Sequence, residues 1–181
     1  MNKILTLIKS LIPGKLFKTL KPPYHFIMSF VAALVYRFPS EKIVVVGITG
    51  TTGKTSSVYL MAKTLEGLGY KVGYTSTAMF NNGEKEWLND KKMTMLGRFF
   101  TQRMIATMNK NNCQIAIIET TSEGVKQFRH RFINYDFVIF TNLYEEHIES
   151  HGSFANYKEA KGKLFAHLSR CQSKCLDKEM R

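Results

Sequence analysis

The amino-acid sequence predicts an α/β fold in which helices flank a mostly parallel β-sheet. Short apolar runs of strand type alternate along the chain with segments whose apolar residues recur at helical spacing. The first run, at residues 43–46, is β-branched and leads through a glycine-containing loop directly into a helix-type segment. Two later runs, at residues 114–119 and 136–141, are each followed by polar residues. In a parallel sheet such residues meet at one edge, where ligands bind.

The composition is that of a globular domain with an uneven positive charge. Of 181 residues, 44% are hydrophobic and 22% are charged, which suits one domain with a core. The net charge is +12, and half of it lies in residues 1–40, which carry six Lys or Arg and no acid. The remainder suits a protein that handles phosphorylated substrates. Because no basic stripe interleaved with aromatic residues follows this arm, we expect no nucleic-acid partner.

The cysteines indicate a reducing environment. Cys113, Cys171 and Cys175 are an odd number, and no further Cys or His pair accompanies them at zinc-finger spacing. We therefore expect a cytoplasmic location, where thiols stay reduced.

Residues 1–40 form a basic, apolar, helical arm ahead of the α/β pattern. Residues 1–23 mix lysines with apolar residues, end at Pro22 and Pro23, and lack the cleavage site of a signal peptide. The apolar run at residues 26–36 is too short to span a bilayer. Two interpretations stay open: a helix packed on the domain, which we favour, or an interfacial helix through which residues 1–38 bind an anionic membrane surface.

Residues 41–170 are expected to form one α/β domain, followed by a polar tail at residues 171–181. The expected elements are strands at 43–46, 70–77, 114–119 and 136–141, a hairpin turn at 81–83, a polar loop at 89–94, and helices from Lys54 onward, at 96–109 and at 154–168. Ser153 is expected to cap the last helix. The apolar face of the first helix is expected to comprise Val58, Met61, Ala62, Leu65 and Leu68.

The loop between the first strand and the first helix predicts a phosphate cradle. Its residues Gly50, Thr51, Thr52 and Gly53 would bring backbone amides up to an anion at a helix N-terminus. Lys54 would neutralise terminal phosphates, and the Thr55 hydroxyl would hold Mg²⁺. Ile48 stands where the usual motif has its first glycine, so the loop is a variant of the P-loop. The alternative is a glycine turn without a ligand.

Two later positions carry residues typical of metal sites. Glu119 ends an apolar strand and would lie beside the phosphate loop, where a carboxylate binds Mg²⁺ or orients water. His147 and His151 are four residues apart and would share one face of a helix. Their order does not match His-Glu-x-x-His, and with no fixed third ligand a zinc site is the weaker interpretation.

Lys161 lies inside the apolar stripe of the last helix. The stripe comprises Tyr157, Ala160, Leu164, Phe165 and Leu168. A lysine on a buried face needs an anionic partner, a shifted pKa or a chemical modification. The alternative, which periodicity alone favours, is a lysine whose ammonium reaches water past the apolar surface.

Five groups of residues together resemble the Mur ligases, the ATP-dependent peptide ligases of bacterial cell-wall synthesis. They are residues 47–55 (GITGTTGKT), 92–94 (KMT), 119–124 (ETTSEG) with Gln127 and Arg129, 141–147 (TNLYEEH) with His151 and Gly152, and 157–161 (YKEAK) with Leu164 and Phe165. They occur in the family's order over residues 41–170. The likeness is greatest to the branch that adds the third residue of the stem peptide.

The resemblance implies a function and a set of roles. ATP would phosphorylate a substrate carboxylate, and an amine would attack the acyl phosphate to give an amide. Lys54 and the loop would hold the ATP phosphates, Thr55 and Glu119 a first Mg²⁺, and His147 a second. Lys161 matches the lysine that the family carbamylates for its metal site. Thr94, Ser122 and Arg129 would contact a UDP-muramoyl-peptide-like substrate, to which an amino acid is joined.

The sequence also departs from the family's pattern. Thr52 replaces the usual Asn, Glu146 the usual Asp, and Met95 and Leu96 the Thr and Pro that commonly follow Thr94. The family's N-terminal UDP-binding domain and its C-terminal ligase domain are not matched, so we expect nucleotide binding with slow turnover from these residues. Two alternatives stay open: a folylpolyglutamate synthase-like ligase, and a catalytically silent, membrane-associated nucleotide-binding module.

Overall fold

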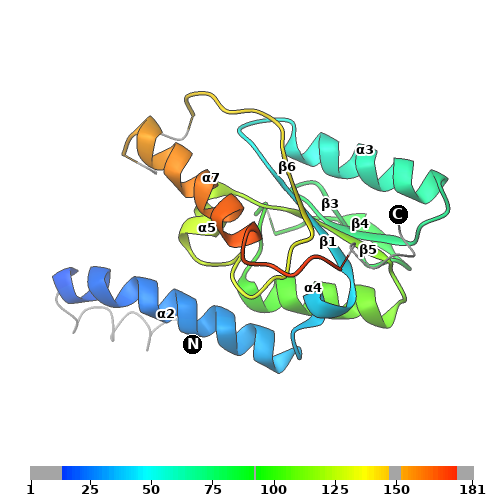
Figure 1. The fold of residues 1–181 in the computed structure, drawn as a ribbon, viewed down its shortest axis with the longest axis horizontal. Coiled ribbons are helices and arrows are strands. Elements are labelled where there is room, and N and C mark those ends of the chain that lie inside the picture. Colours follow the sequence, from blue (N-terminus) through cyan, green and yellow to red (C-terminus); the bar gives the residue numbers. More distant parts are fainter. Residues whose placement is uncertain (1–13, 92, 147–151, 175–181) are drawn as a thin grey trace.

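The fold is a six-stranded sheet between layers of helices, seen in a computed structural model that describes residues 14–91, 93–146 and 152–174. The strand order is β4-β3-β2-β5-β1-β6 (Figure 1). The strands are β1 (Val44–Thr49), β2 (Val72–Thr75), β3 (Met79–Asn81), β4 (Glu86–Leu88), β5 (Ile115–Glu119) and β6 (Phe137–Phe140). Strands β2, β5, β1 and β6 pair in parallel, whereas β3 and β4 form an antiparallel hairpin. The predicted mostly parallel α/β fold is confirmed.

Helices cover both faces of this sheet. The elements are α2 (Gly14–Val35), η1 (Pro39–Lys42), α3 (Lys54–Gly67), α4 (Arg98–Lys110), α5 (Ser122–Lys126) and α7 (Phe154–Leu168). Helix α3 packs on β2, β5 and β1, while α4 lies on the opposite face with α2 outside it (Figure 1). Helices α5 and α7 pack against each other.

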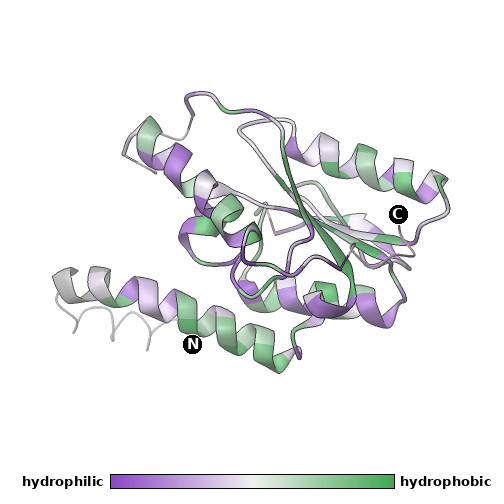
Figure 2. Ribbon diagram, viewed as in Figure 1, coloured by the Kyte–Doolittle hydropathy of each residue, from purple (hydrophilic) through white to green (hydrophobic). Residues whose placement is uncertain are grey.

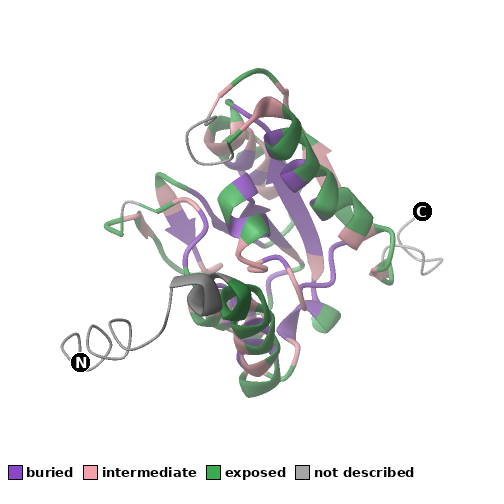
Figure 3. Ribbon diagram, turned by 90° about the vertical axis from the view of Figure 1, so that its left-hand side faces the viewer, coloured by how far each residue is buried: buried purple, intermediate pink, exposed green. Residues whose placement is uncertain are grey.

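Alternating side chains along the central strands build one core on each face. Val45, Ala116 and Ile118 point toward α4, whereas Val46, Ile48 and Ile117 point toward α3. This period of two is what a strand buried on both faces requires. Figure 3 shows the resulting buried sheet at the centre of the fold.

The strand register brings three carboxyl ends to one edge. Ile48 of β1 pairs with Glu119 of β5, and Thr49 of β1 pairs with Phe140 of β6. The loop after β1, Glu119 and the segment after β6 therefore lie next to one another. The sheet thus places the predicted phosphate loop and Glu119 at one edge.

The segment after α7 is tied back to the sheet by a buried carboxylate. Asp136 accepts hydrogen bonds from the Val45 amide (2.8 Å) and the Lys174 amide (2.6 Å). Its side chain is fully buried and also pairs with the Lys174 ammonium at 2.8 Å. Removing one member of such a pair leaves a buried charge without compensation, so this contact constrains both segments.

Helix α2 differs from the sequence-based expectation. Pro22 and Pro23 do not end a segment, because one helix of 22 residues continues through them. Both prolines lie on solvent-exposed positions, where a lost amide hydrogen bond is replaced by water more easily than in a core. The favoured packing interpretation is confirmed for one face: Ser29, Ala32 and Ala33 are buried, and the Ser29 hydroxyl donates to the Phe128 carbonyl at 2.9 Å.

The other predicted helices are correct in position but not in every buried residue. Helix α7 has the predicted bounds, and the Ser153 side chain caps it by accepting from the Asn156 amide. Leu68, expected on the buried face of the first helix, is exposed because α3 ends at Gly67 and Leu68 is its C-terminal cap.

Candidate functional site

The loop between β1 and α3 needs glycine at two positions. Gly53 has φ = 76°, a left-handed conformation that side chains adopt only with strain, and it is the N-terminal cap residue of α3. At Gly50 the constraint is contact, because a Cβ atom there would lie 1.8 Å from the Thr141 hydroxyl. The loop therefore lies directly against the end of β6.

The beginning of α3 offers backbone donors. The first hydrogen bond of the helix runs from the Ser57 amide to the Gly53 carbonyl. The preceding amides, of Lys54, Thr55 and Ser56, have no acceptor within the helix by geometry, and the helix dipole adds a positive potential there. Such a terminus binds phosphate groups.

Asn142 fixes the shape of the loop. Its side-chain carbonyl accepts hydrogen bonds from the Thr51 amide (3.1 Å) and the Thr52 amide (3.0 Å). The Tyr144 hydroxyl donates to the Thr52 hydroxyl at 2.6 Å. This role was not predicted from the sequence, where the available signal was a polar residue directly after a strand. The Asn142 side chain also donates to the Thr52 hydroxyl. Thr52, which stands where the family usually has Asn, therefore accepts hydrogen bonds from two neighbouring side chains.

Two lysine ammonium groups converge on the same loop carbonyl. The Lys54 ammonium donates to the carbonyls of Gly50 (3.1 Å) and Thr51 (2.6 Å). The Lys161 ammonium, from α7, donates to the Gly50 carbonyl at 2.6 Å. Lys161 is only 3% exposed, so the interpretation that its ammonium reaches water is wrong.

The surroundings of Lys161 lower the pKa of its ammonium group. Burial, together with the charge of Lys54, lowers the pKa of Lys161 to about 8, although the Glu146 carboxylate opposes the shift. The ammonium also lies 4.6 Å from the centre of the Tyr157 ring, whose hydroxyl donates to the Thr51 hydroxyl. A substantial neutral fraction is therefore present near pH 8.

Glu119 is a buried carboxylate held by neutral donors. It is 1% exposed and accepts from the Thr55 hydroxyl at 3.0 and 3.1 Å. Thr77 adds its amide (2.7 Å) and its hydroxyl (3.0 Å). Within residues 14–91, 93–146 and 152–174, no Lys, Arg or His lies within ion-pair distance of Glu119. Thr77 was missed from the sequence, where it was only the end of an expected strand.

The Thr55–Glu119 pair fits Mg²⁺ by its chemistry. A carboxylate and a hydroxyl are oxygen donors, which Mg²⁺ prefers, and a buried carboxylate without a cationic partner favours a bound cation. In the described part of the chain, no three His, Cys, Asp or Glu side chains converge as a metal site. His147, expected at a second Mg²⁺, and His151 lie outside the described residues.

The three residues expected to contact a substrate are placed along the same edge. The Thr94 and Thr77 hydroxyls are hydrogen-bonded to each other at 2.8 Å, which links Thr94 through one residue to Glu119. Arg129 donates to the carbonyl of Met95, the residue after Thr94. Ser122 begins α5, three residues after Glu119, and is buried. The structure therefore connects Thr94 with both Glu119 and Arg129.

Met95 and Leu96, two further departures from the family's pattern, are core residues. Both are buried in the cluster beneath α4. Met95 also packs on Gly124 of α5, where an added Cβ would lie 2.5 Å from the Met95 sulfur. Their apolar character therefore anchors the Thr94 loop to the domain.

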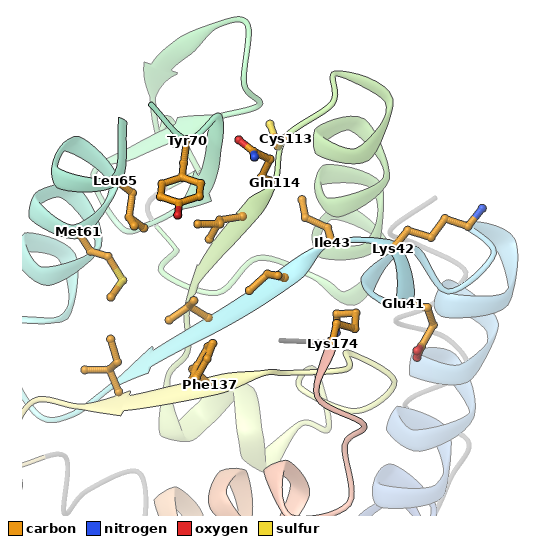
Figure 4. Close-up of a pocket in the computed structure, with 14 residues that line it drawn as sticks. Glu41, Lys42, Ile43, Met61, Leu65, Tyr70, Cys113, Gln114, Phe137 and Lys174 are labelled. Atoms are coloured by element: carbon orange, nitrogen blue, oxygen red, sulfur yellow. The ribbon is translucent and has the colours of Figure 1, made fainter. Parts of the chain in front are cut away.

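A cavity of about 870 Å³ lies away from the phosphate loop (Figure 4). It runs beside α3, where Met61 and Leu65 face the sheet, and reaches Phe137 of β6. Lys42, Glu41 and Lys174 lie at its end (Figure 4). Its mainly apolar wall has none of the loop amides, so it is not the phosphate site.

The domain has a strand, a glycine loop and a helix in sequence, with two lysines on the loop and a carboxylate against the first helical hydroxyl. This arrangement is typical of phosphate-binding α/β domains. Residues 48–178 match the family model of the Mur ligase middle domain. The chain therefore belongs to the Mur ligase family, and the resemblance seen in the sequence is confirmed.

Similarity to individual proteins agrees with this assignment. The chain is 34% identical over 146 residues to a UDP-N-acetylmuramyl-tripeptide synthetase of Treponema pallidum, an alignment that covers 80% of this chain and 27% of that protein. The chain thus spans about a quarter of the length of that curated relative.

Two solved structures share the fold. A UDP-N-acetylmuramoyl-L-alanyl-D-glutamate–2,6-diaminopimelate ligase matches with a TM-score of 0.59 and 25% identity, over 68% of this chain and 24% of that one. FolC of E. coli, in complex with DHPP and ADP, matches with a TM-score of 0.53 over 74% of this chain and 38% of that one. At 15% identity, the FolC match shows the fold alone.

The lowered pKa of Lys161 predicts a pH-dependent stability. Between pH about 8 and 10.5 the unfolded chain binds more protons than the folded chain, so the free energy of unfolding rises with pH, by roughly 3 kcal/mol over the full interval. We expect Lys161→Met to lose this rise and to be the more stable protein at pH 7. Urea unfolding from pH 7 to 9.5 measures it, with the exposed Lys158→Met on the same helix as control. Equal slopes for wild type and Lys161→Met would contradict the assignment.

Proposed function

We propose that this chain is the ATP-binding domain of an ADP-forming amide ligase that acts in peptidoglycan precursor synthesis. The observation that carries the proposal is the convergence of Lys54, Lys161 and the Thr55–Glu119 pair on one loop. Membership of the Mur ligase family supports the reaction class. ATP and the reduced thiols expected from the cysteine pattern suit action in the cytoplasm.

The residues of the loop would bind the triphosphate of ATP. Lys54 already lies at the loop, and on binding its ammonium would exchange two carbonyl partners for phosphate oxygens, which are stronger acceptors. The amides at the start of α3 would donate to the same phosphates. Thr55 and Glu119 would hold Mg²⁺, which when bound neutralises charge on the phosphate oxygens.

The reaction has two displacement steps. A substrate carboxylate oxygen bonds to the γ-phosphorus of ATP while the bond to the bridging oxygen breaks, which gives an acyl phosphate and ADP. The amine of an amino acid then bonds to the acyl carbon, phosphate leaves, and the nitrogen loses a proton, which gives the amide. Negative charge develops on oxygens in both steps, so Lys54 and the helix terminus would stabilise the transition states.

Lys161 is suited to carbamylation. Its neutral amine would attack CO₂ to give a carbamate and a proton, and the pKa of about 8 makes that neutral form available. The product would replace an ammonium by an anion beside the loop, where it would support a second Mg²⁺ together with His147. The burial of Lys161 supports this role, since a buried lysine is costly when no carboxylate of the described residues lies within ion-pair distance of it.

A UDP-muramoyl-peptide is the carboxylate substrate that we infer, with Thr94, Ser122 and Arg129 as its contacts. The 34% identity to a muramyl-tripeptide synthetase favours it over a folate, because the likeness to FolC extends to the fold only.

Lys54→Ala is expected to weaken binding of Mg·ATP at least a hundredfold, because it removes the ammonium that faces the phosphates. Isothermal titration of the full chain measures the dissociation constant. The exposed Lys158→Ala removes an equal charge from α7 and should leave affinity unchanged. Unchanged affinity in Lys54→Ala would refute the phosphate site.

Arg129→Ala is expected to weaken binding of UDP-muramoyl-L-Ala-D-Glu about tenfold or more in the presence of a non-hydrolysable ATP analogue, because a charged hydrogen bond is lost. The exposed Arg170→Ala serves as the matched control. Tight binding of a folate, with none of the muramoyl peptide, would reverse the choice of substrate.

Carbamylation of Lys161 is expected to give a ¹³C resonance under ¹³CO₂ that is absent in Lys161→Arg and retained in Lys158→Arg. At constant dissolved CO₂ the signal should grow as pH rises through about 8, because the neutral amine is the reactive form. NMR of the ligand-free chain reads this without any activity assay. Identical spectra for wild type and Lys161→Arg would exclude the modification.

A further inference from the structure

Helix α2 turns its large apolar side chains away from the domain. Its inner face consists of small or polar residues, with Ser29, Ala32 and Ala33 at most 1% exposed. Its outer face carries five large apolar residues that are about half exposed: Leu20 (48%), Tyr24 (55%), Ile27 (57%), Leu34 (54%) and Val35 (59%). A surface helix of a globular protein normally has the opposite arrangement.

The exposed residues form one continuous outer stripe. Leu20, Tyr24, Ile27, the partly exposed Val31 and Leu34 follow one another at alternating spacings of four and three, which places them on one side of a helix. Figure 2 shows the apolar colouring concentrated toward the C-terminal end of α2, and Figure 3 shows the same helix largely exposed. The stripe is therefore a surface with no covering element among the described residues.

The flanks of α2 fix this orientation. Phe26 packs edge-to-face on Phe128 and Phe132, with ring centres 6.1 and 5.2 Å apart. Phe30 packs on Phe132 in the same way, at 5.3 Å. With the Ser29 hydrogen bond to the Phe128 carbonyl, these contacts prevent the helix from rotating to bury the stripe.

The charge around the stripe has one sign. Residues 1–40 carry six Lys or Arg and no Asp or Glu. Among these, Lys21 and Arg37 are exposed near the two ends of the stripe. Apolar side chains accompanied by cations are typical of helices that lie in the interface of an anionic bilayer.

We propose that the outer stripe of α2 is a docking surface for an anionic lipid bilayer, with the helix lying in the plane of the membrane. No helix in the described part of the chain is long and apolar enough to cross a bilayer, which agrees with an interfacial position. Helix α3, which begins at the phosphate loop, lies on the opposite side of the sheet from α4 and α2 (Figure 1). The phosphate loop therefore stays open to solvent when α2 is docked.

A second copy of this chain fits the stripe less well. The spacing also suits a helix pair, but coiled coils use opposite charges beside the seam, and α2 contains no acid with which to form them. Two copies would instead bring two cationic arms together, which opposes association. The stripe is also shorter than the three to four heptads of a stable coiled coil.

Flotation of the full chain with vesicles tests the proposal. We expect the chain to float with vesicles of phosphatidylcholine and phosphatidylglycerol, and at least tenfold less with phosphatidylcholine alone. Raising the salt from about 0.1 M to about 1 M should reduce flotation strongly, because it shortens the screening length. Ile27→Gln/Leu34→Gln should lower flotation at least tenfold. Leu60→Gln/Leu68→Gln, which changes two apolar residues elsewhere that are even more exposed, should leave flotation unchanged.

Each other outcome overturns the proposal. If wild type stays unbound, or if Ile27→Gln/Leu34→Gln floats like wild type, α2 is not the docking surface. If lipid is not bound and sedimentation shows a dimer that Ile27→Gln/Leu34→Gln dissociates, the occupant is a second copy. Nucleotide binding plays no part in this assay, so its result is independent of the proposed function.

Discussion

The close approach between the β1–α3 loop and the end of β6 is the constraint on which the site depends. Gly50 lies so near Thr141 that no side chain fits, and Asn142 holds the next two loop amides. This contact aims the Gly50 carbonyl at the two lysines and leaves the start of α3 open. Without the segment after β6, the Thr51 and Thr52 amides would lose the Asn142 acceptor, and the loop would keep its contacts with Lys54 and Lys161.

The charged side chains around the loop are paired with neutral groups and not with one another, which favours ligand binding over folding stability. Lys54 and Lys161 share a carbonyl instead of a carboxylate, and Glu119 is held by hydroxyl and amide donors instead of a cation. For folding alone, direct ion pairs between the two lysines and Glu119 would cost less free energy than burying these charges apart. Keeping them apart leaves the lysines available to an anion and the carboxylate to a cation, which is the requirement for binding a metal–phosphate complex.

The sequence was sufficient wherever a local pattern decides the structure. The Ser153 cap and the apolar stripe set the bounds of α7, and the stripe singled out Lys161. The roles of Thr77, Asn142 and Tyr144 were not predictable, because each acts through hydrogen bonds to residues at least 17 positions away. Pro22 and Pro23 were wrongly expected to end the N-terminal segment. Both are tolerated inside α2 because they are exposed to solvent, and the exposure of a residue depends on the assembled fold.

Strand β6 is an edge strand of the sheet, and this position determines where a further strand can pair with the domain. Among the described residues, no strand pairs with one side of its backbone, and Phe137 and Phe140 remain nearly half exposed. A free strand edge is a template for another strand. A strand added at this edge would extend the sheet between these two rings, because Phe137 lines the cavity beside α3 and Phe140 packs on Phe165 of α7.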